Sequence, residues 1–586
     1  MAAAAVGKAR RIEVFDPRGA KEITRLHANR IDGLAGKRIA VISNAMWQAH
    51  RTLPCLLERL ERDFPDTTFL PLDRFPQGNA EIDSDAMLEA LRGERVDAVI
   101  VGNAACGACA TACGRAAARI EAAGIPTVLL ARDDFADVAR NAFTAFGFDQ
   151  EAAMVTFPLS LFVAGSDLAV IEAKFEQFVE GLTRWRPLAD TVGLRRPNRI
   201  ALDTGSDASD VTAVVQAVNR AYLMNGCGDG LPVLPPTDAL VEWILTGSDL
   251  PRDHVVGRIM PRGGIATIET IAVTLAMAGG RPEYLPVLVA ALDALLDPTM
   301  EHGKAQANSG SPFPVVIVNG PAGHQIRLNS GFGLLGPDPR KPAGASIGRA
   351  LRLLLQNVGG ALPGQGTMAA YGGMRYTNAV FAEADEMLPA AWQPLSADYD
   401  IPAGSNSVTV FAAVGGVSAP RRAISSERLE DEIVNGLHRI AAYMRTPNRD
   451  YVVGWAHGVP GGLLISPTVA HQLARLRWSK RDMQAFLWEH AKVPMDVVER
   501  AGLTEWIRTG PDPLTRAAPI DPWPICRTPE QILIAVAGGD HPSNHFWFPA
   551  DAPAVATRAY DVPQAWGELL QRAEYDLGPG GSACTL

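Results

Sequence analysis

Several familiar catalytic signatures are absent from this 586-residue sequence. No GxGxxG follows a predicted strand and no GxxxxGK[ST] occurs, so the usual glycine-rich phosphate loops are missing. The HExxH pair of zinc peptidases is missing too. No apolar run reaches about 18 residues, and no long basic run occurs, so we expect neither a membrane helix nor a nucleic-acid partner. The formal net charge of −10 supports the second exclusion.

Cysteine is scarce, with seven residues in the whole chain. A small disulfide-stabilised protein would have a higher density, and a chain of this length can bury cores without disulfides. The N-terminal apolar run is short and precedes its positive charges, which is the reverse of a secretory signal. We therefore expect a cytoplasmic protein with reduced thiols.

The first third of the chain alternates between strand and helix patterns. The predicted strands are Arg38–Ser43, Thr68–Leu72, Val96–Val101, Thr127–Ala131 and Met154–Phe157. The predicted helices between them are Arg51–Asp63, Ser84–Arg92, Ala110–Ala123 and Phe135–Phe146. This alternation predicts an α/β fold with a flavodoxin-like, doubly wound parallel sheet. Ligands of such sheets bind beyond the carboxyl ends of the strands.

The rest of the chain predicts a larger mixed α/β region. A connecting helix is expected over Ala201–Leu223, and the glycine- and proline-rich segment Gly226–Pro236 follows it. A basic helix is expected over Ile347–Gln356. The predicted domains are an N-terminal extension (1–34), the sheet domain (35–195), a second α/β domain (196–425) and a C-terminal region (426–586).

Three cysteines cluster where the third predicted strand meets the next helix. Cys106 and Cys109 have two residues between them, the spacing of dithiol redox pairs, and Cys113 follows. A helix N-terminus carries partial positive charge and free N–H groups, which favour the thiolate. The pattern predicts that Cys106 is a nucleophile and that Cys109 resolves its adduct. Two alternatives remain open, a packed pair of small residues and a metal or iron–sulfur site built from the three cysteines.

Other candidate residues lie in loops and on one helix. Cys227 and Asp229 stand in the GCGDG turn, as a possible second thiol and general base. Arg349 and Arg352 share one helix face, where arginine forks suit an anionic substrate. The further candidates for substrate binding are polar residues near predicted strand ends or this helix: Asn103, Asn319, Asn329, Ser330 and Ser346.

The cysteine segment resembles a known family. Gly102–Ala112 (GNAACGACATA), with Gly124–Thr127 and Asp134-Phe135 after it, resembles the UGSC family of (seleno)proteins, named for a selenocysteine/cysteine–Gly–Ser–Cys motif. Cys106 stands at the selenocysteine/cysteine position, Ala108 replaces the serine, and Cys113 is an additional thiol. Blocks such as Asp229–Thr237, Met277–Pro286 and Ile347–Leu353 resemble a long, multi-domain form of that family.

The resemblance implies a redox-active selenol or thiol at position 106. Together with the residue patterns, it leads us to expect an enzyme that reduces, or transfers sulfur to or from, a small anionic metabolite through a covalent Cys106 adduct. A thiol reductant or sulfur donor and a homo-oligomer are possible partners, and no cofactor is expected. The alternatives are a lyase that uses a metal or iron–sulfur cluster and a non-catalytic metabolite- or metal-binding protein.

Overall fold

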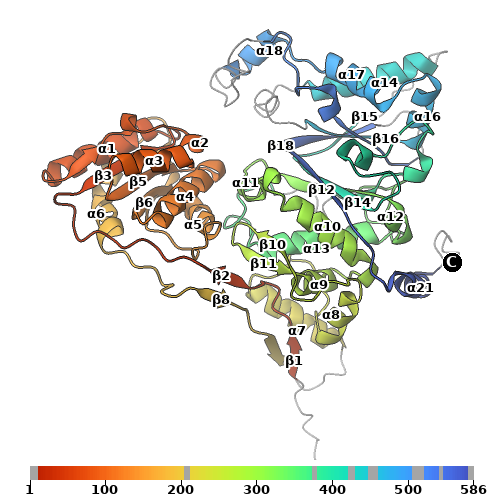
Figure 1. The fold of residues 1–586 in the computed structure, drawn as a ribbon, viewed down its shortest axis with the longest axis horizontal. Coiled ribbons are helices and arrows are strands. Elements are labelled where there is room, and N and C mark those ends of the chain that lie inside the picture. The colour runs from red at the N-terminus through yellow and green to blue at the C-terminus, as the bar shows by residue number, and fades with distance from the viewer. Residues whose placement is uncertain are drawn as a thin grey trace, which may run out of the picture.

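The computed structural model describes residues 11–203, 211–372, 379–419, 429–445, 460–504, 520–539 and 545–578. They form two lobes that lie side by side (Figure 1). The thiol lobe comprises residues 38–183, and the large lobe comprises the described residues from 211 onward. No described helix is both long enough and apolar enough to cross a membrane.

A five-stranded parallel sheet forms the centre of the thiol lobe. Its strands are β3 (Arg38–Ser43), β4 (Thr68–Leu70), β5 (Ala98–Ala104), β6 (Thr127–Arg132) and β7 (Met154–Phe157). They lie in the order β4-β3-β5-β6-β7, and every neighbouring pair is parallel. This order is that of flavodoxin-like sheets, which confirms the predicted fold class.

Helices cover both faces of this sheet because alternate strand residues point to opposite sides. Along β6, Leu129 and Ala131 pack on one face while Val128 and Leu130 pack on the other. The first face is covered by α3 (Asp85–Gly93), α4 (Gly107–Ala122) and α5 (Ala136–Thr144), and the second by α1 (Ala49–Asp63) and α6 (Ala169–Thr183). The short α2 (Asn79–Ile82) contacts α4.

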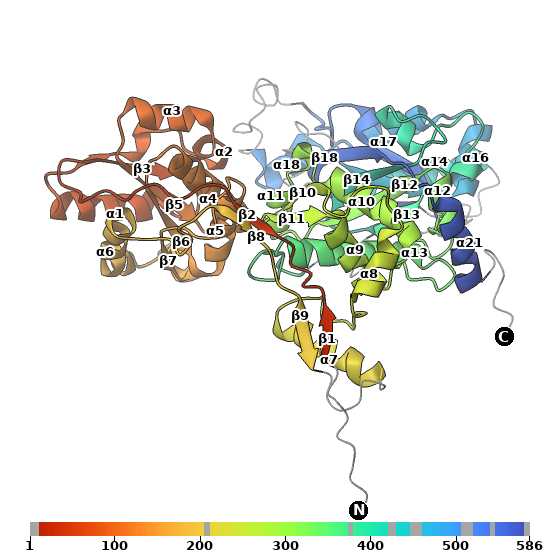
Figure 2. The ribbon, with the colours of Figure 1, turned by 60° about the horizontal axis from the view of Figure 1, so that its bottom comes forward.

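Two pairs of antiparallel strands join the lobes. Strand β2 (Lys21–Ile23) pairs with β8 (Gly193–Arg195), and β1 (Arg11–Val14) pairs with β9 (Ile200–Asp203). Helix α7 (Val211–Met224) follows β9, and Figure 2 shows β1, β9 and α7 projecting together from the large lobe. The chain therefore enters and leaves the thiol lobe through adjacent strands.

A mixed seven-stranded sheet forms the centre of the large lobe, with the order β13-β12-β14-β18-β16-β17 and with β15 paired to β18. Its strands are β12 (Phe313–Asn319), β13 (Ala379–Ala382), β14 (Ser407–Ala413), β15 (Val417–Ala419), β16 (Gly461–Ile465), β17 (Leu533–Val536) and β18 (His545–Ala559). The β12–β13 and β16–β17 pairs are parallel and the others antiparallel. Separately, β10 (Val255–Ile259) pairs with β11 (Gly264–Thr267).

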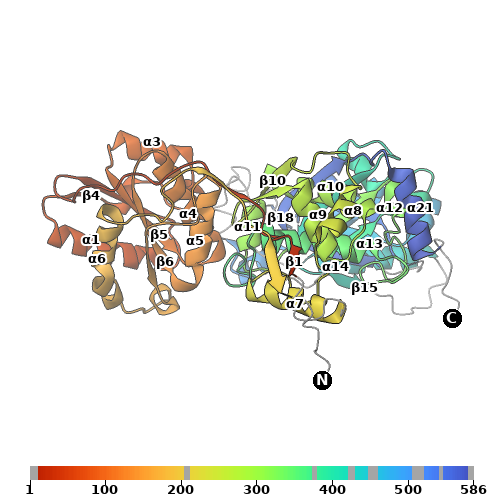
Figure 3. The ribbon, with the colours of Figure 1, turned by 90° about the horizontal axis from the view of Figure 1, so that it is seen from below.

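The large-lobe helices pack around this sheet as Figure 3 shows from below. Their bounds are α8 (Asp238–Leu245), α9 (Ile268–Met277), α10 (Leu285–Leu295), α11 (His302–Ala307), α12 (Pro321–Gln325), α13 (Ala343–Leu353), α14 (Leu429–Met444), α16 (Pro467–Arg475), α17 (Lys480–His490), α18 (Met495–Arg500) and α21 (Trp566–Leu577). Helices α9, α10 and α13 share one apolar core with β12, β13 and β14. Helices α14, α16 and α17 share another with β16 and β17.

Several element bounds differ from the sequence-based expectations, including the following three. Residues 201–203 belong to strand β9, so the connecting helix begins later, and 204–210 lie outside the described residues. The third strand of the thiol lobe extends to Ala104, three residues beyond the apolar run. The helix expected to end at Gln356 is α-helical only to Leu353 and continues as a π-helical turn over Leu354–Val358.

Candidate functional site

Cys106 is the N-cap residue of α4, directly beyond the carboxyl end of β5. Its extended backbone (φ −144°, ψ 174°) turns its side chain back over the first helical turn. The backbone N–H of Cys109 donates a hydrogen bond to the Cys106 sulfur at 3.3 Å. A sulfur in the N-cap position thus receives one of the free N–H groups and the positive end of the helix dipole, and both stabilise a thiolate.

The sulfurs of Cys106 and Cys109 lie 2.8 Å apart and are not bonded to each other. The Cys109 thiol donates to the Cys106 sulfur, and this hydrogen bond outweighs burial and lowers the pKa of Cys106 to about 6. The same interaction, together with burial, strongly raises the pKa of Cys109. The two thiols are therefore distinct: Cys106 is half-buried and ionised near neutral pH, whereas Cys109 is buried and protonated.

The Trp47 side chain supplies a further donor to the Cys106 sulfur, and this hydrogen bond also lowers the Cys106 pKa. Trp47 lies in the loop between β3 and α1, where Ala45, Trp47 and Gln48 all adopt left-handed backbone conformations (φ 56°, 53° and 65°). Non-glycine residues rarely adopt this conformation, and it persists only where surrounding contacts hold it.

Asn103 holds that loop in place. It is fully buried, and its side-chain amide donates to the Trp47 carbonyl at 2.8 Å and to Thr52 Oγ1 at 2.9 Å. Asn44 accepts from the Asn103 backbone N–H at 2.9 Å. Asn103, predicted to bind substrate, is therefore placed where it positions Trp47 instead.

Asn44, Trp47 and Asn79 were not predicted from the sequence as residues near the thiols. The amide of Asn79, on α2, lies 3.7 Å from the Cys109 sulfur and 3.2 Å from the Asn44 amide. The sequence did contain a signal for Asn44 and Trp47. The loops that follow the first and third predicted strands begin at the same edge of a parallel sheet, so their residues lie close together. Applying that rule to Asn44 and Trp47 would have found them.

The thiol motif lies at the boundary between the lobes. A Cβ built on Gly107 would overlap the backbone carbonyl of Ala307, the last residue of α11 in the large lobe. Across the same boundary, Thr144 Oγ1 donates to the Pro261 carbonyl at 2.7 Å. Only glycine fits position 107 in this arrangement, so the second residue of the Cys-Gly-Ala-Cys motif is determined by packing.

Cys113 does not complete a metal site. It is fully buried in the core beneath α4, and burial strongly raises its pKa. Over the described ranges, no three His, Cys, Asp or Glu side chains are grouped so that they could hold a metal ion. The arrangement of Cys106, Cys109 and Cys113 therefore gives no support to the iron–sulfur or zinc alternative.

Cys227 and Asp229 do not join Cys106 in the structure. Cys227 is 3% exposed in the large-lobe core, and burial raises its pKa to about 11. Asp229 forms a two-point ion pair with Arg349, at 2.8 and 2.9 Å. Burial opposes ionisation of Asp229, but the hydrogen bonds and charge of Arg349 outweigh it and lower its pKa. The pair fastens the turn at residues 227–232 to α13.

The remaining candidates also lie in the large lobe, away from the thiol loop. Asn319, at the end of β12, donates to Glu383 and Asp385 at 2.7 Å each. Asn329 is 4% exposed and shapes its own loop, while the Ser330 carbonyl accepts from Gly538 N–H at 2.8 Å. Arg352 is half-buried in the last turn of α13.

Ser346, a candidate for substrate binding, lies in a segment that resembles a catalytic motif. The segment 344–348 reads Gly-Ala-Ser-Ile-Gly, which has the letters of a GxSxG nucleophile elbow. The structure places Ser346 in the first turns of α13, in a helix that does not follow a strand. The strand–turn–helix context that exposes such a serine is missing, so the motif does not indicate a hydrolase.

A comparison with protein-family models finds one match, and it covers the thiol lobe. Residues 13–184 match the UGSC family. The UGSC match contains β3–α6 and with them Cys106, Cys109 and Trp47. The blocks from Asp229 to Leu353, on which the longer resemblance rested, lie outside the UGSC segment. Searches of curated proteins and of solved structures found no match.

Proposed function

We propose that the protein is a thiol-dependent reductase of a small oxidised metabolite, with Cys106 as nucleophile and Cys109 as resolving thiol. The observation that carries the proposal is the pairing of a half-buried Cys106, whose pKa is lowered to about 6, with a Cys109 sulfur 2.8 Å away. A thiolate attacks, and a neighbouring thiol then releases the adduct.

The proposed step balances for a disulfide substrate RSSR′. The Cys106 thiolate attacks one sulfur, which forms a Cys106–SR mixed disulfide and expels R′S⁻, which takes up a proton. Cys109 then gives up its proton and attacks the Cys106 sulfur, and RS⁻ leaves with that proton as RSH. The substrate gains two electrons and the enzyme becomes a Cys106–Cys109 disulfide, which a dithiol reductant returns to the starting state.

Sulfur transfer is the second candidate and uses the same thiolate. In sulfur transfer, a persulfide on Cys106 would have to persist until an acceptor binds. With Cys109 at 2.8 Å, internal displacement is the nearest available reaction, and this favours reduction.

The binding of an anionic substrate at the thiol has less support. Arg349 was expected to anchor it, but its guanidinium is engaged by Asp229 and by the carbonyls of Leu231 and Pro232. The proposed reduction therefore does not require the substrate to be an anion.

Mass spectrometry of the reduced protein after exposure to 2-hydroxyethyl disulfide tests the proposal. We expect the wild type to lose two hydrogens as the Cys106–Cys109 disulfide forms, and Cys109→Ser to retain one half of the probe on Cys106. Cys55→Ser is the matched control, because Cys55 is also half-buried but burial raises its pKa. A Cys106→Ser variant that consumes the probe at the wild-type rate would refute the assignment. A persulfide that persists on Cys106 after exposure to a polysulfide would favour sulfur transfer.

A further inference from the structure

The Cys109 sulfur lies between two side chains with opposite effects on it. It donates its proton to the Cys106 sulfur at 2.8 Å, and it accepts from the side-chain amide of Asn79 at 3.7 Å. Among the described residues, Asn79 is the one hydrogen-bond donor recorded for this sulfur. Cys109 is 1% exposed, so bulk water has little access to any charge it acquires. Asn79 is therefore the group placed to act on Cys109 when this thiol loses its proton.

Backbone donors determine which end of the Asn79 amide faces the sulfur. The side-chain oxygen of Asn44 accepts from the backbone N–H groups of Met46 and Asn103, at 3.3 and 2.9 Å. Because a backbone N–H can only donate, the other end of the Asn44 amide is its NH₂ group. That NH₂ group donates to the Asn79 side-chain oxygen at 3.2 Å. The NH₂ group of Asn79 is therefore the end that points at Cys109.

The start of α2 holds Asn79 beside the thiols. Asn79 is the first residue of α2, and α2 contacts α4, the helix that contains Cys109. The backbone N–H of Gly78, directly before it, donates at 3.2 Å to the carbonyl of Ser43, the last residue of β3. The segment is thus fastened to the same edge of the sheet as the loop that carries Cys106.

The influence of Asn79 on Cys109 grows during the proposed reaction. In the reduced protein, the hydrogen bond to Cys106 is the main cause that raises the pKa of Cys109, burial is the next, and Cys106 and Cys113 add repulsion. The Asn79 N–H acts in the opposite direction and lowers this pKa. Once Cys106 carries an adduct, its sulfur is uncharged, and Cys113 is protonated because burial raises its pKa. Burial of Cys109 is then opposed by Asn79.

We propose that Asn79 is a catalytic residue of the resolving step, in which its amide N–H stabilises the negative charge that develops on the Cys109 sulfur. This role rests on the proposed reductase function. In that step the Cys106–SR bond breaks, the Cys106–Cys109 bond forms, and the Cys109 proton leaves with RS⁻ as RSH. Asn79 neither gains nor loses a proton. A fixed donor that points at a developing charge in a buried site lowers the barrier of such a step.

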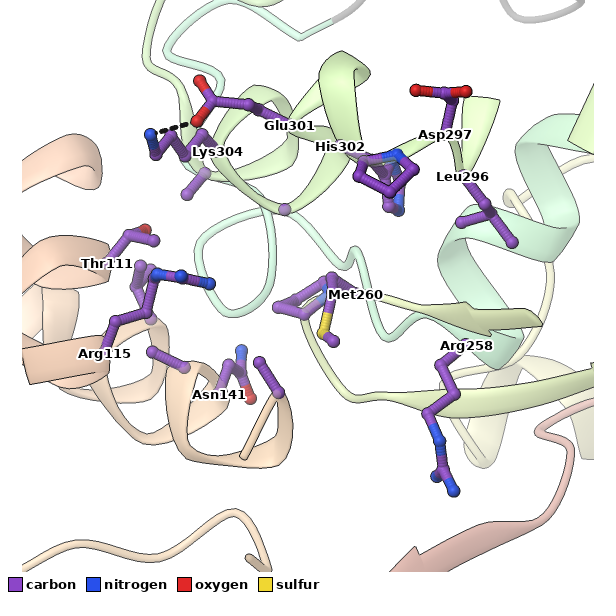
Figure 4. Close-up of a pocket in the computed structure, with 17 residues that line it drawn as sticks. Thr111, Arg115, Asn141, Arg258, Met260, Leu296, Asp297, Glu301, His302 and Lys304 are labelled. Carbon is purple, nitrogen blue, oxygen red and sulfur yellow. Dashed lines mark hydrogen bonds and ion pairs between the residues drawn. The ribbon is translucent and has the colours of Figure 1, made fainter. Parts of the chain in front are cut away.

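The cavity between the lobes plays no part in this stabilisation. It has a volume of about 300 Å³ and is lined by Thr111 and Arg115 of α4 and by large-lobe residues such as Met260 (Figure 4). Neither Cys109 nor Asn79 is among its lining residues. The side chains that act on the Cys109 sulfur belong to the thiol lobe.

Stopped-flow measurement of thiopyridone release from dithiodipyridine tests the proposal on the full chain. Attack by Cys106 releases the first thiopyridone at a rate proportional to the probe concentration, and resolution by Cys109 releases the second at a rate independent of it. The parent protein and all variants carry Cys55→Ser and Cys584→Ser, because Cys55 is half-buried and Cys584 lies outside the described residues. The second phase therefore measures the resolving step.

Asn79→Ala should slow the second phase by about tenfold at neutral pH, the factor expected for a lost hydrogen bond to a developing charge, and should change the first phase by less than about twofold. The pH profile of the second phase should move to higher pH, since Cys109 then ionises less readily. Asn79→Asp keeps the oxygen that accepts from Asn44 but presents a second oxygen to the sulfur. The second phase of this variant should be slower than that of Asn79→Ala.

Gln77→Ala is the matched control. Gln77 is an exposed side-chain amide two residues before Asn79, and it donates to the Leu72 carbonyl rather than to a thiol. Its removal should leave both phases unchanged. An equal slowing of the second phase in Gln77→Ala and Asn79→Ala would overturn the assignment.

Two further results would overturn the proposal. One is a second phase in Asn79→Ala that keeps the parent rate. The other is a slowing by the same factor at every pH, because a misplaced Cys109 would have that effect without moving the profile. Asn79→Asp, which retains the contact with Asn44, provides the same test if the alanine variant does not fold.

Failure of the proposed function looks different. A parent protein that shows a single phase, or a Cys109→Ser variant that still shows both, would contradict the resolving role of Cys109 itself. Two phases in the parent and one in Cys109→Ser, with Asn79→Ala indistinguishable from the parent, would contradict the role of Asn79 alone.

Discussion

The backbone carbonyl of Ala307 occupies the space that a side chain on Gly107 would need. The carbonyl belongs to the main chain and the position of a Cβ is fixed by its own backbone, so a rotamer change cannot relieve the overlap. Gly107→Ala must displace α11 or the first turn of α4, and we expect a loss of about 1–3 kcal/mol in the free energy of unfolding.

Gly93→Ala is the matched control for that prediction. Gly93 ends α3, and a Cβ there meets nothing within 4 Å. Alanine should leave stability unchanged or raise it by about 0.5–1 kcal/mol. Denaturant melts of the two variants compare them directly, and equal stabilities would contradict the tight contact between the lobes.

The alkylation rate of Cys106 should rise with pH around a midpoint of about 6, because its thiolate is the reactive form. Since the Cys109 thiol is the main donor to Cys106, Cys109→Ala should move that midpoint up toward the ordinary value of about 8.5. Trp47→Phe removes the weaker donor and should move it less. Iodoacetamide kinetics with peptide mapping measure each midpoint, and an unchanged midpoint in Cys109→Ala would contradict the assignment.

Glu121 should make the stability of the thiol lobe depend on pH at the acid end. Burial disfavours its ionised form, but His27 and Arg30 outweigh burial and lower its pKa below the ordinary 4.5. A lowered pKa stabilises the fold above pH 4.5, and this contribution disappears as the pH falls through the folded-state value. Thermal melts between pH 3 and pH 7 measure the slope.

Glu121→Gln should remove much of that slope and cost about 3–5 kcal/mol at neutral pH, since it leaves Arg30 buried beside a neutral amide. The control is Glu180→Gln on α6, where the pair with Arg184 is exposed and should contribute little. A similar loss in both variants would contradict this account.

Arg349→Lys should reduce stability more than it alters any ligand affinity. Lysine keeps the charge but cannot make the two-point contact with Asp229 or reach both carbonyls of the turn. We expect a loss of about 1–3 kcal/mol. Arg352→Lys, one turn along α13, is the control. If Arg349→Lys melts like the wild type, the original expectation of a substrate anchor regains support.

The architecture of the thiol lobe could be predicted because its signals are local. The buried strands and amphipathic helices around Cys106 follow each other at βα spacing, and chain order then determines which loops share an edge. The contribution of Trp47 could not be obtained from periodicity. It depends on Asn103 holding three left-handed residues in place, which is a property of tertiary hydrogen bonds.

The sequence is least informative where a residue type suggests chemistry but its partner lies far away in the chain. Arg349 and Asp229 are 120 residues apart, and nothing local indicates that they pair with each other. The sequence provides candidate groups, whereas the fold decides which of them remain unpaired.

The register of β2 and β8 sets Ile23 opposite Gly193, so the two points where the chain crosses into the thiol lobe are neighbours across one strand pair. A unit whose ends emerge side by side can be inserted into a single loop of another protein without stretching its host. Trp47 and Cys109, whose side chains donate to the Cys106 sulfur, both lie within that unit. The side chains that donate to the Cys106 sulfur thus belong to the thiol lobe alone, and none of them comes from the large lobe.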